Sequence, residues 1–457
     1  MHHQDKDQNQ DQNQDQNLNR PDRQDAEAGR RLVVRGAVAS GLALSAAIAY
    51  GLTRSRSSKP TWPLGSSRAR PRPGPASPPG ARPSATPVAG GPPTPLWRIA
   101  LNRPSDERPL LAGGKVLVKA NLRQDVTGIA DLQAYDSATG NHSWTYPGVA
   151  ALDVTEAHVA ADRVVLREEL GSVLVLDPVT GRRTAEFGAD RTGLYVLVVE
   201  GSNGSTVYTW GTLTTSGDPL AGNAPAAVAA WDSQRGMLLW HQPALGTLAH
   251  VQAMYVAGQG ALVFSVDVAD HVIGRDAATG AVRWSVDIGA EPTLGAHGAP
   301  FYAVSEPLGL CFTTRRKTVA WDASTGTERW NIGPRTAAHH FGESLLSGDG
   351  RTLFTTELGP GASVLAVDAA SGAVRWRRSP GALTPDGRIA LCGPDLLVVP
   401  AGDGSDGIWG LDTADGSQRW HYSEPATTSA PWQVATDPAA GLVAACQQNT
   451  LLALPLG

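Results

Sequence analysis

Short apolar runs separated by polar turns recur along this chain from Trp97 to its last residues. Each run predicts a strand, and it is followed by Asp-x-x-x-Gly and then, four positions later, by Trp. Helical repeats of similar length would instead place apolar residues at a 3.6-residue period, which does not appear. The pattern therefore predicts strands joined by tight hairpins, and an all-β domain.

The repeat is intact in six copies and degenerate in a seventh. The intact copies contain Asp136, Gly140 and Trp144; Asp232, Gly236 and Trp240; Asp276, Gly280 and Trp284; Asp322, Gly326 and Trp330; Asp368, Gly372 and Trp376; and Asp412, Gly416 and Trp420. The degenerate copy, LDPVTGRRTAEF, keeps Asp177 and Gly181 but has Ala185 at the Trp position, which predicts a less tightly packed blade. Successive Asp residues lie 41, 55, 44, 46, 46 and 44 residues apart. This is the period of a four-stranded propeller blade.

Each position of the repeat has a physical role in this interpretation. The Asp side chain accepts backbone N–H bonds in an Asx-type turn, and Gly supplies the positive φ of the tight hairpin. The Trp of the following strand docks against the neighbouring blade and buries a large apolar surface. We therefore expect structural docking by Trp97, Trp144, Trp240, Trp284, Trp330, Trp376 and Trp420.

The two ends of the repeat region predict how the ring closes. The last copy, NTLLALPLG, supplies a third strand at residues 452–454 and has Pro455 at the Asp position. Its fourth strand is expected from PLWRIAL, with Trp97 at the docking position, so that no sheet edge is left open at the junction. Docking positions 97, 144, 185, 240, 284, 330, 376 and 420 together predict eight four-stranded blades.

The repeat resembles the pyrroloquinoline-quinone-like (PQQ-like) propeller family over nearly all of residues 96–457. That family includes quinoprotein alcohol dehydrogenases, the propeller lipoprotein of outer-membrane β-barrel assembly and extracellular domains of bacterial membrane proteins. The resemblance implies a bacterial, extracytoplasmic protein. Recurrence in register is specific for the fold, whereas the motif says little about function.

Three segments precede the propeller. Residues 1–30 are rich in Gln, Asn and Asp and are expected to be disordered, because they contain almost no apolar surface to bury. Residues 31–52 include an uncharged apolar run at 36–52, near the short limit for crossing a bilayer. Residues 53–95 are rich in Pro, Gly, Ser and Arg and predict an extended linker.

Arg30 and Arg31 precede the apolar run and resemble a twin-arginine export signal. The small residues at 47–49 offer a cleavage site, and an uncleaved signal anchor is the alternative. The predicted location is the cell membrane with the propeller outside the cytoplasm, or secretion if the signal is cleaved.

The charge of the chain bears on its partners, and the positions of its cysteines bear on the state of their thiols. The whole chain has 38 Lys and Arg against 43 Asp and Glu, and the basic excess lies before residue 96, which leaves an acidic body. Nucleic-acid binding needs a basic footprint, so no nucleic-acid partner is expected. Cys311, Cys392 and Cys446 lie far apart in apolar stretches and predict buried free thiols.

An enzymatic alternative comes from the family resemblance. Quinoprotein dehydrogenases hold their quinone with calcium, an Asp base and often an adjacent Cys-Cys disulfide, and this chain has no Cys-Cys pair. The acidic residues Glu168, Glu169, Asp267, Asp270 and Glu357 follow no recognisable calcium spacing. Catalytic, cofactor-binding and metal residues are therefore not assigned and no cofactor is expected, with PQQ and calcium as the alternative.

The longest insertion, between Tyr208 and Ala227, explains the 55-residue step of the repeat. Its Trp210, Asp218 and Asn223 are candidates for contact with a protein, peptide or glycan, and a tolerated surface insertion is the alternative. The sequence as a whole predicts a monomeric, membrane-tethered binding, scaffold or sensor module, with a quinone-dependent dehydrogenase as the second reading.

Overall fold

The computed structural model describes most of the repeat region. It covers residues 92–456 except for 106, 122–128, 151–157, 168–170, 189–191, 214–224, 244–253, 257–261, 267–270, 288–300, 315, 384–387, 403–406 and 425–429. Its elements are 31 β-strands. None of the described residues forms a helix long and apolar enough to cross a membrane. The predicted tail, the signal or anchor with Arg30 and Arg31, and the linker up to residue 91 lie outside the described residues.

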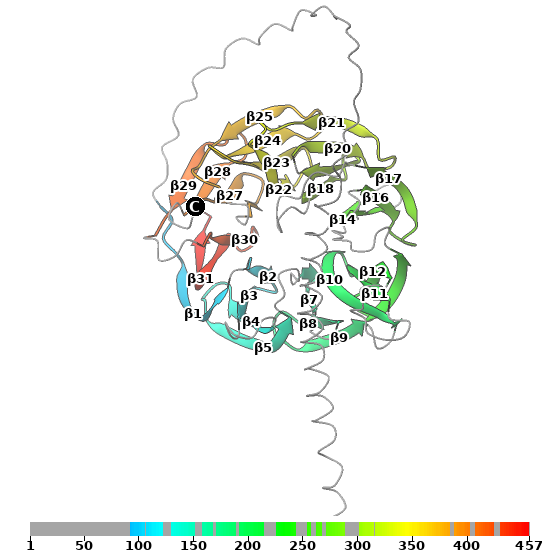
Figure 1. The fold of residues 1–457 in the computed structure, drawn as a ribbon. Coiled ribbons are helices and arrows are strands. Elements are labelled where there is room, and N and C mark those ends of the chain that lie inside the picture. The colour runs from blue at the N-terminus through cyan, green and yellow to red at the C-terminus, as the bar shows by residue number, and fades with distance from the viewer. Residues whose placement is uncertain are drawn as a thin grey trace, which may run out of the picture. The chain divides into compact units, whose positions relative to one another are not determined.

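The strands form sheets that follow one another around a ring (Figure 1). Seven sheets have four antiparallel strands each, in simple sequence order. The first two are β2 (Leu110–Ala112), β3 (Lys115–Asn121), β4 (Ile129–Asp136) and β5 (His142–Ala150), then β6 (His158–Ala160), β7 (Arg163–Arg167), β8 (Ser172–Leu176) and β9 (Arg183–Gly188). The next two are β10 (Leu194–Asn203), β11 (Thr206–Leu213), β12 (Ala226–Asp232) and β13 (Met237–Pro243), then β14 (Met254–Val256), β15 (Leu262–Val266), β16 (His271–Asp276) and β17 (Val282–Asp287).

The other three four-stranded sheets complete most of the ring. They are β18 (Phe301–Ser305), β19 (Leu310–Thr314), β20 (Thr318–Asp322) and β21 (Glu328–Ile332); β22 (His340–Leu346), β23 (Thr352–Leu358), β24 (Ser363–Asp368) and β25 (Val374–Arg378); and β26 (Ala390–Cys392), β27 (Leu396–Pro400), β28 (Ile408–Asp412) and β29 (Gln418–Tyr422). In each sheet the first strand lies nearest the centre of the ring and the fourth lies at the rim (Figure 1). An all-β propeller with four-stranded blades is thus confirmed.

A three-stranded sheet joins the two ends of the repeat region. It has the order β1 (Trp97–Ser105), β31 (Leu442–Pro455) and β30 (Gln433–Asp437). The first part of β31 pairs with β30 and the last part pairs with β1. The prediction of eight four-stranded blades is therefore shown for seven sheets, because the closing sheet has three strands, with β31 pairing to both of its neighbours.

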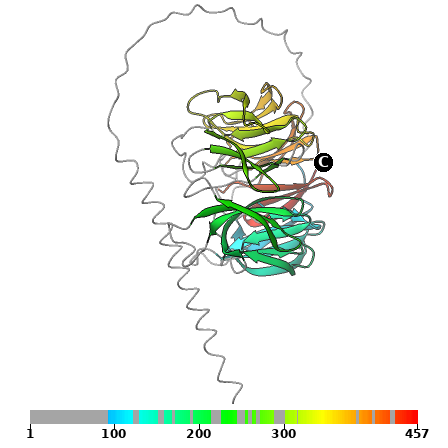
Figure 2. The same ribbon diagram turned by 90° about the vertical axis from the view of Figure 1, so that its right-hand side faces the viewer.

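Antiparallel order gives the ring two distinct faces (Figure 2). The turns between first and second strands and between third and fourth strands lie at one end of each sheet. We call this end the Asp-turn face, since the Asp-x-x-x-Gly segments are there. The connections between second and third strands, and from one sheet to the next, lie at the opposite face.

Apolar side chains fill the space between neighbouring sheets. Leu117 and Leu132 of one sheet pack with Val164 and Leu174 of the next. Further round the ring, a cluster that includes Phe354 bridges sheets β22–β25 and β26–β29 in the same way. The core is therefore divided among the interfaces between sheets, and inner strands such as β23 and β27 are buried along their whole length because both of their faces are covered.

Candidate functional site

The Asp turns share one hydrogen-bond pattern, seen clearly at Asp276. Its backbone carbonyl accepts the N–H of Gly280 at 2.7 Å, and Gly280 has a φ of 72°. Its Oδ1 accepts the backbone N–H groups of Ala278 and Thr279, each at 3.0 Å. The same carbonyl-to-glycine bond is present at Asp136, Asp177, Asp232, Asp322, Asp368 and Asp412.

An arginine seven residues further on completes several of these turns. The second carboxylate oxygen of Asp276 accepts Arg283 Nη2 at 2.5 Å, and that of Asp368 accepts Arg375 Nη2 at 2.7 Å. The bond from Arg375, together with that from Ser371, lowers the pKa of Asp368 to about 2. Arg419 and Asp412 form the same pair at 2.6 Å. Each pair ties the outer strand to its own turn.

The docking tryptophans lie against the Asp turn of the next sheet. In six of the seven the indole N–H donates to the carbonyl of the residue that follows Asp. The bonds are Trp97 to Ser137 (2.8 Å), Trp144 to Pro178 (2.9 Å), Trp240 to Ala277 (2.7 Å), Trp284 to Ala323 (3.0 Å), Trp330 to Ala369 (3.0 Å) and Trp376 to Thr413 (2.9 Å). The rings cover the turn glycines so closely that a Cβ on Gly181 would lie 2.5 Å from Trp144.

Trp420 differs from the other six. Its side chain is buried, and its indole N–H has no hydrogen-bond partner in the part of the chain that the structure describes. The neighbouring sheet has Pro455 where the other sheets have Asp, so no Asp turn faces this indole. Trp420 is therefore held by apolar contacts with residues such as Trp432 and Leu454.

The junction at Ala185 is filled by a different pair of rings. Phe187 stacks on Trp231, with ring centroids 4.7 Å apart and planes inclined by 24°. Trp231 is fully buried and donates its indole N–H to Thr209 Oγ1 at 2.8 Å. The expectation of loose packing there missed this stack. The available signal was a Trp immediately before the repeat Asp, as in WDSQRG.

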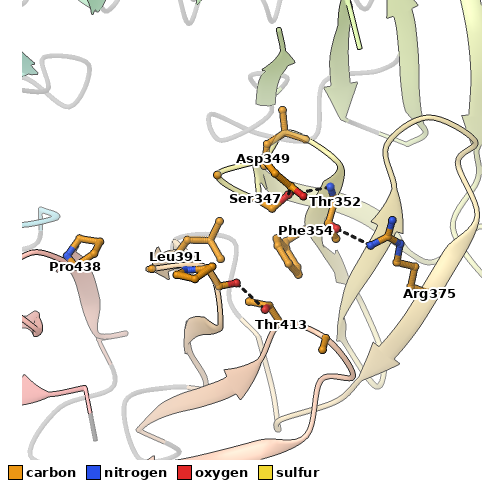
Figure 3. A pocket seen from close by; sticks show the side chains of 13 residues that line it. Ser347, Asp349, Thr352, Phe354, Arg375, Leu391, Thr413 and Pro438 are labelled. Atoms are coloured by element: carbon orange, nitrogen blue, oxygen red, sulfur yellow. Dashed lines mark hydrogen bonds between the residues drawn. The ribbon is translucent and has the colours of Figure 1, made fainter. Parts of the chain in front are cut away.

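A cavity of about 700 Å³ opens on the Asp-turn face (Figure 3). It lies among the turns of sheets β22–β25 and β26–β29 and the turn that follows β30. Its apolar lining includes Leu346, Phe354, Leu391, Pro394 and Pro438. Its polar lining comes from Ser347, Asp349, Thr352, Arg375 and Thr413.

The polar groups at this cavity are bonded to one another. Arg375 Nη1 donates to Thr352 Oγ1 at 2.8 Å, and Thr413 Oγ1 donates to the carbonyl of Pro394 at 2.8 Å (Figure 3). Ser347 Oγ donates to Asp349 Oδ1 at 2.5 Å, and this bond lowers the pKa of Asp349. These contacts fix the polar rim and leave the apolar floor as the surface open to a ligand. No residue of this cavity was singled out from the sequence.

The predicted contact loop is only partly described. Trp210 lies on strand β11 and packs beside Tyr208, Val228 and Trp240. Its indole N–H is buried without a hydrogen-bond partner among the described residues. This packing favours a core role for Trp210. Asp218 and Asn223 lie outside the described residues.

A calcium–quinone site would need several oxygen ligands placed together. Among them there is no group of three or more His, Cys, Asp or Glu side chains placed to hold a metal ion. The Glu357 carboxylate forms ion pairs with Arg335 and Arg377, with N···O distances of 2.9 and 3.2 Å. Glu168, Glu169, Asp267 and Asp270 lie outside the described part.

The three cysteines are free thiols buried in the sheets. Burial raises the pKa of Cys311 far above its ordinary value and that of Cys392 to about 11. A thiol held protonated in this way is a poor nucleophile. These cysteines act as apolar packing residues.

Comparison with known proteins places this fold. The family model described as outer membrane protein assembly factor BamB matches residues 93–194, 198–338 and 315–456. No curated protein matches the chain in sequence. Solved structures that share the fold at low sequence identity include a BamB, a designed protein and an alcohol dehydrogenase.

The structure of BamB from Moraxella catarrhalis is 14% identical, with a TM-score of 0.51, over 79% of this chain and 99% of that one. The computationally designed Ika8 protein is 16% identical, with a TM-score of 0.50, over 78% and 98%. Quinohemoprotein alcohol dehydrogenase from Comamonas testosteroni is 11% identical, with a TM-score of 0.54, over 80% and 76%.

The ring of Trp-docked, four-stranded sheets defines a PQQ-like repeat β-propeller. Because the family model matches nearly all of residues 93–456, the chain belongs to the family described as outer membrane protein assembly factor BamB.

Proposed function

We propose that this chain is a non-enzymatic, membrane-tethered propeller outside the cytoplasm, which binds an extended segment of a protein partner. The observation that carries the proposal is the cavity on the Asp-turn face, with its apolar floor and internally bonded polar rim. The name of the matching family, an assembly factor, supports a role in holding other proteins. Residues 36–52 supply the proposed membrane segment and residues 53–95 the linker.

The cavity has the size and chemistry to take apolar side chains of a partner. Leu346 and Leu391 are half-buried at its wall, and Phe354 is buried beneath. Covering these groups removes apolar surface from water, which stabilises a complex by roughly 25 cal/mol per Å². The rim groups keep their own hydrogen bonds, so binding does not leave them unpaired.

Rigidity is the second contribution of the fold. The six Trp-to-carbonyl bonds and the closing sheet hold adjacent turns at a fixed spacing.

We further propose that the closing sheet is an eighth blade. The N–H of Leu456 donates to the carbonyl of Gly441 at 3.2 Å, which brings the two ends of β31 together as in a folded hairpin.

Site-specific photocrosslinking tests the cavity. A benzophenone amino acid at Ala414, an exposed residue of the cavity, is expected to give one discrete protein adduct when the full chain is in its native membranes. Ala278 is the matched control, because it has the same place in the repeat on a distant sheet. The Ala414 adduct is expected to disappear with Leu391→Glu, which puts a charge into the apolar floor.

The proposal is wrong if position 414 gives no adduct, or if positions 414 and 278 capture the same proteins. It is also wrong if Leu391→Glu leaves the adduct unchanged. The melting temperature of each variant shows whether the ring is intact.

A quinone-dependent dehydrogenase is the second candidate. The likeness to quinohemoprotein alcohol dehydrogenase supports it at the level of fold alone. Among the described residues, no group of three or more His, Cys, Asp or Glu side chains is placed to hold a metal ion. The Glu357 carboxylate forms ion pairs with two arginines. We therefore place the binding function first.

A further inference from the structure

Glu357 lies near the end of β23, at the opposite face of the ring, and its side chain is fully buried. Its Oε2 lies 2.9 Å from Arg335 Nε and 3.2 Å from Arg377 Nη1. Its Oε1 accepts the backbone N–H of Arg335 at 2.6 Å, and Ser363 Oγ lies 3.3 Å from Oε2. One buried carboxylate thus holds two guanidinium groups and leaves the cluster with a net positive charge.

Arg335 is fixed before any ligand arrives. Its Nη2 donates to the carbonyl of Gly361 at 2.6 Å. The adjoining backbone is pinned by His339, whose Nε2 donates to the carbonyl of Pro360 at 2.9 Å and whose Nδ1 accepts from Thr336 Oγ1 at 2.7 Å. The His339 tautomer follows from these partners, because a carbonyl can only accept. A guanidinium held in this way loses little conformational freedom when it binds an anion.

Both arginines remain partly open to solvent. The side chains of Arg335 and Arg377 are 38% and 29% exposed, while that of Glu357 is 0% exposed. A guanidinium has five N–H donors in one plane. The bonds from the Arg335 side chain to Glu357 and Gly361 use Nε and one hydrogen of Nη2, which leaves the Nη1 edge for a further acceptor.

The neighbouring sheet adds positive charge at the same face. Thr318 pairs with Ile332, so the exposed Arg316 and Lys317 precede a strand that lies beside the segment leading to Arg335. Basic side chains gathered at one face favour a partner of complementary charge.

We propose that Arg335 and Arg377, held by Glu357, form a binding site for the carboxylates of an acidic peptide segment. A planar carboxylate matches the planar guanidinium edge and accepts two parallel N–H bonds. The site lies on the face opposite the apolar cavity, so it goes beyond the proposed function and is tested independently of it.

Fluorescence anisotropy tests the proposal with the full-length chain and a fluorescein-labelled peptide of eight glutamates. The wild-type chain is expected to bind it, more weakly as salt is raised, and not to bind a Ser-Gly peptide of equal length. Arg335→Gln and Arg377→Gln are each expected to weaken binding roughly tenfold, since a charge-assisted hydrogen bond is lost. Arg419→Gln is the control for charge, because Arg419 lies on the Asp-turn face.

Glu357→Gln separates a binding site from a purely structural ion pair. The Gln amide oxygen can still accept from the arginines, but the competing negative charge is gone, so peptide binding is expected to strengthen roughly threefold if the arginines bind carboxylates. Binding that is unchanged in both arginine variants overturns the proposal. So does Glu357→Gln weakening binding in a chain that circular dichroism shows to be folded.

Discussion

The indole N–H of Trp376 donates to the carbonyl oxygen of Thr413 at 2.9 Å, which joins the outer strand β25 to the Asp turn of the next sheet. Trp284 makes the equivalent bond to Ala323 at 3.0 Å. Replacing either Trp by Ala is expected to lower the free energy of unfolding by about 3–5 kcal/mol, because it leaves a cavity between sheets. Thermal unfolding of the purified chain measures this.

The control for these variants is Val374→Ala on the same outer strand, where the side chain is 44% exposed. It is expected to change the free energy of unfolding by less than about 0.5 kcal/mol. Unchanged melting temperatures for both Trp variants would contradict the docking role.

Close packing of Trp on the turn glycine makes a second prediction. A Cβ on Gly140 would lie 2.8 Å from Trp97, whereas a Cβ on Gly114 would have nothing within 4 Å. Both residues have positive φ, 72° and 69°, so both Ala variants incur a backbone cost of roughly 1–2 kcal/mol. Gly140→Ala is expected to be the more destabilising variant in chemical denaturation, and equal losses would show that the Trp moves away freely.

The Asp368–Arg375 pair predicts a dependence of stability on pH. The pKa of Asp368 is lowered to about 2 in the folded chain, chiefly by Arg375 and Ser371, against about 3.9 for an unfolded Asp. Its contribution is therefore complete above about pH 4 and is lost as pH falls toward 2. The gap in melting temperature between wild type and Asp368→Asn is expected to shrink over that range. A constant gap from pH 5 to pH 2.5 would contradict the assignment.

The junction without a docking Trp makes a fourth prediction. A Cβ on Gly236 would lie 3.8 Å from the Cβ of Ala185 and 3.4 Å from the carbonyl of Glu186, so the two sheets approach closely there. Ala185→Trp is expected to destabilise the chain by about 1–3 kcal/mol through overpacking. A higher melting temperature would instead reveal unfilled space at this junction.

The fold could be predicted from the sequence because each copy of the repeat is formed by residues close together in the chain. Asp, Gly and Trp recur within nine residues, and their hairpin is formed by neighbours in the chain, so the period alone indicates four-stranded blades. The closing sheet was predicted to join β1 to the last strand, which the structure confirms through pairs such as Trp97 with Ala453.

The proposed binding surfaces could not be predicted from the sequence in the same way. The cavity gathers Leu346, Leu391 and Pro438 from three sheets, and the Glu357 cluster gathers arginines 22 and 20 residues away on different elements. Such groupings depend on how neighbouring sheets pack against one another, which the spacing of residues within one repeat does not determine. Trp231 lies immediately before Asp232, outside the Asp-x-x-x-Gly-x-x-x-Trp spacing, so the repeat pattern does not predict its role.

We propose that this propeller acts through binding surfaces and not through a quinone cofactor. Calorimetric titration of the full-length chain with PQQ and calcium, followed by a dye-linked alcohol oxidation assay, tests it most directly. We expect no saturable heat of binding and no turnover. Tight binding of one quinone per chain, together with turnover, would contradict it and make the chain a quinoprotein dehydrogenase.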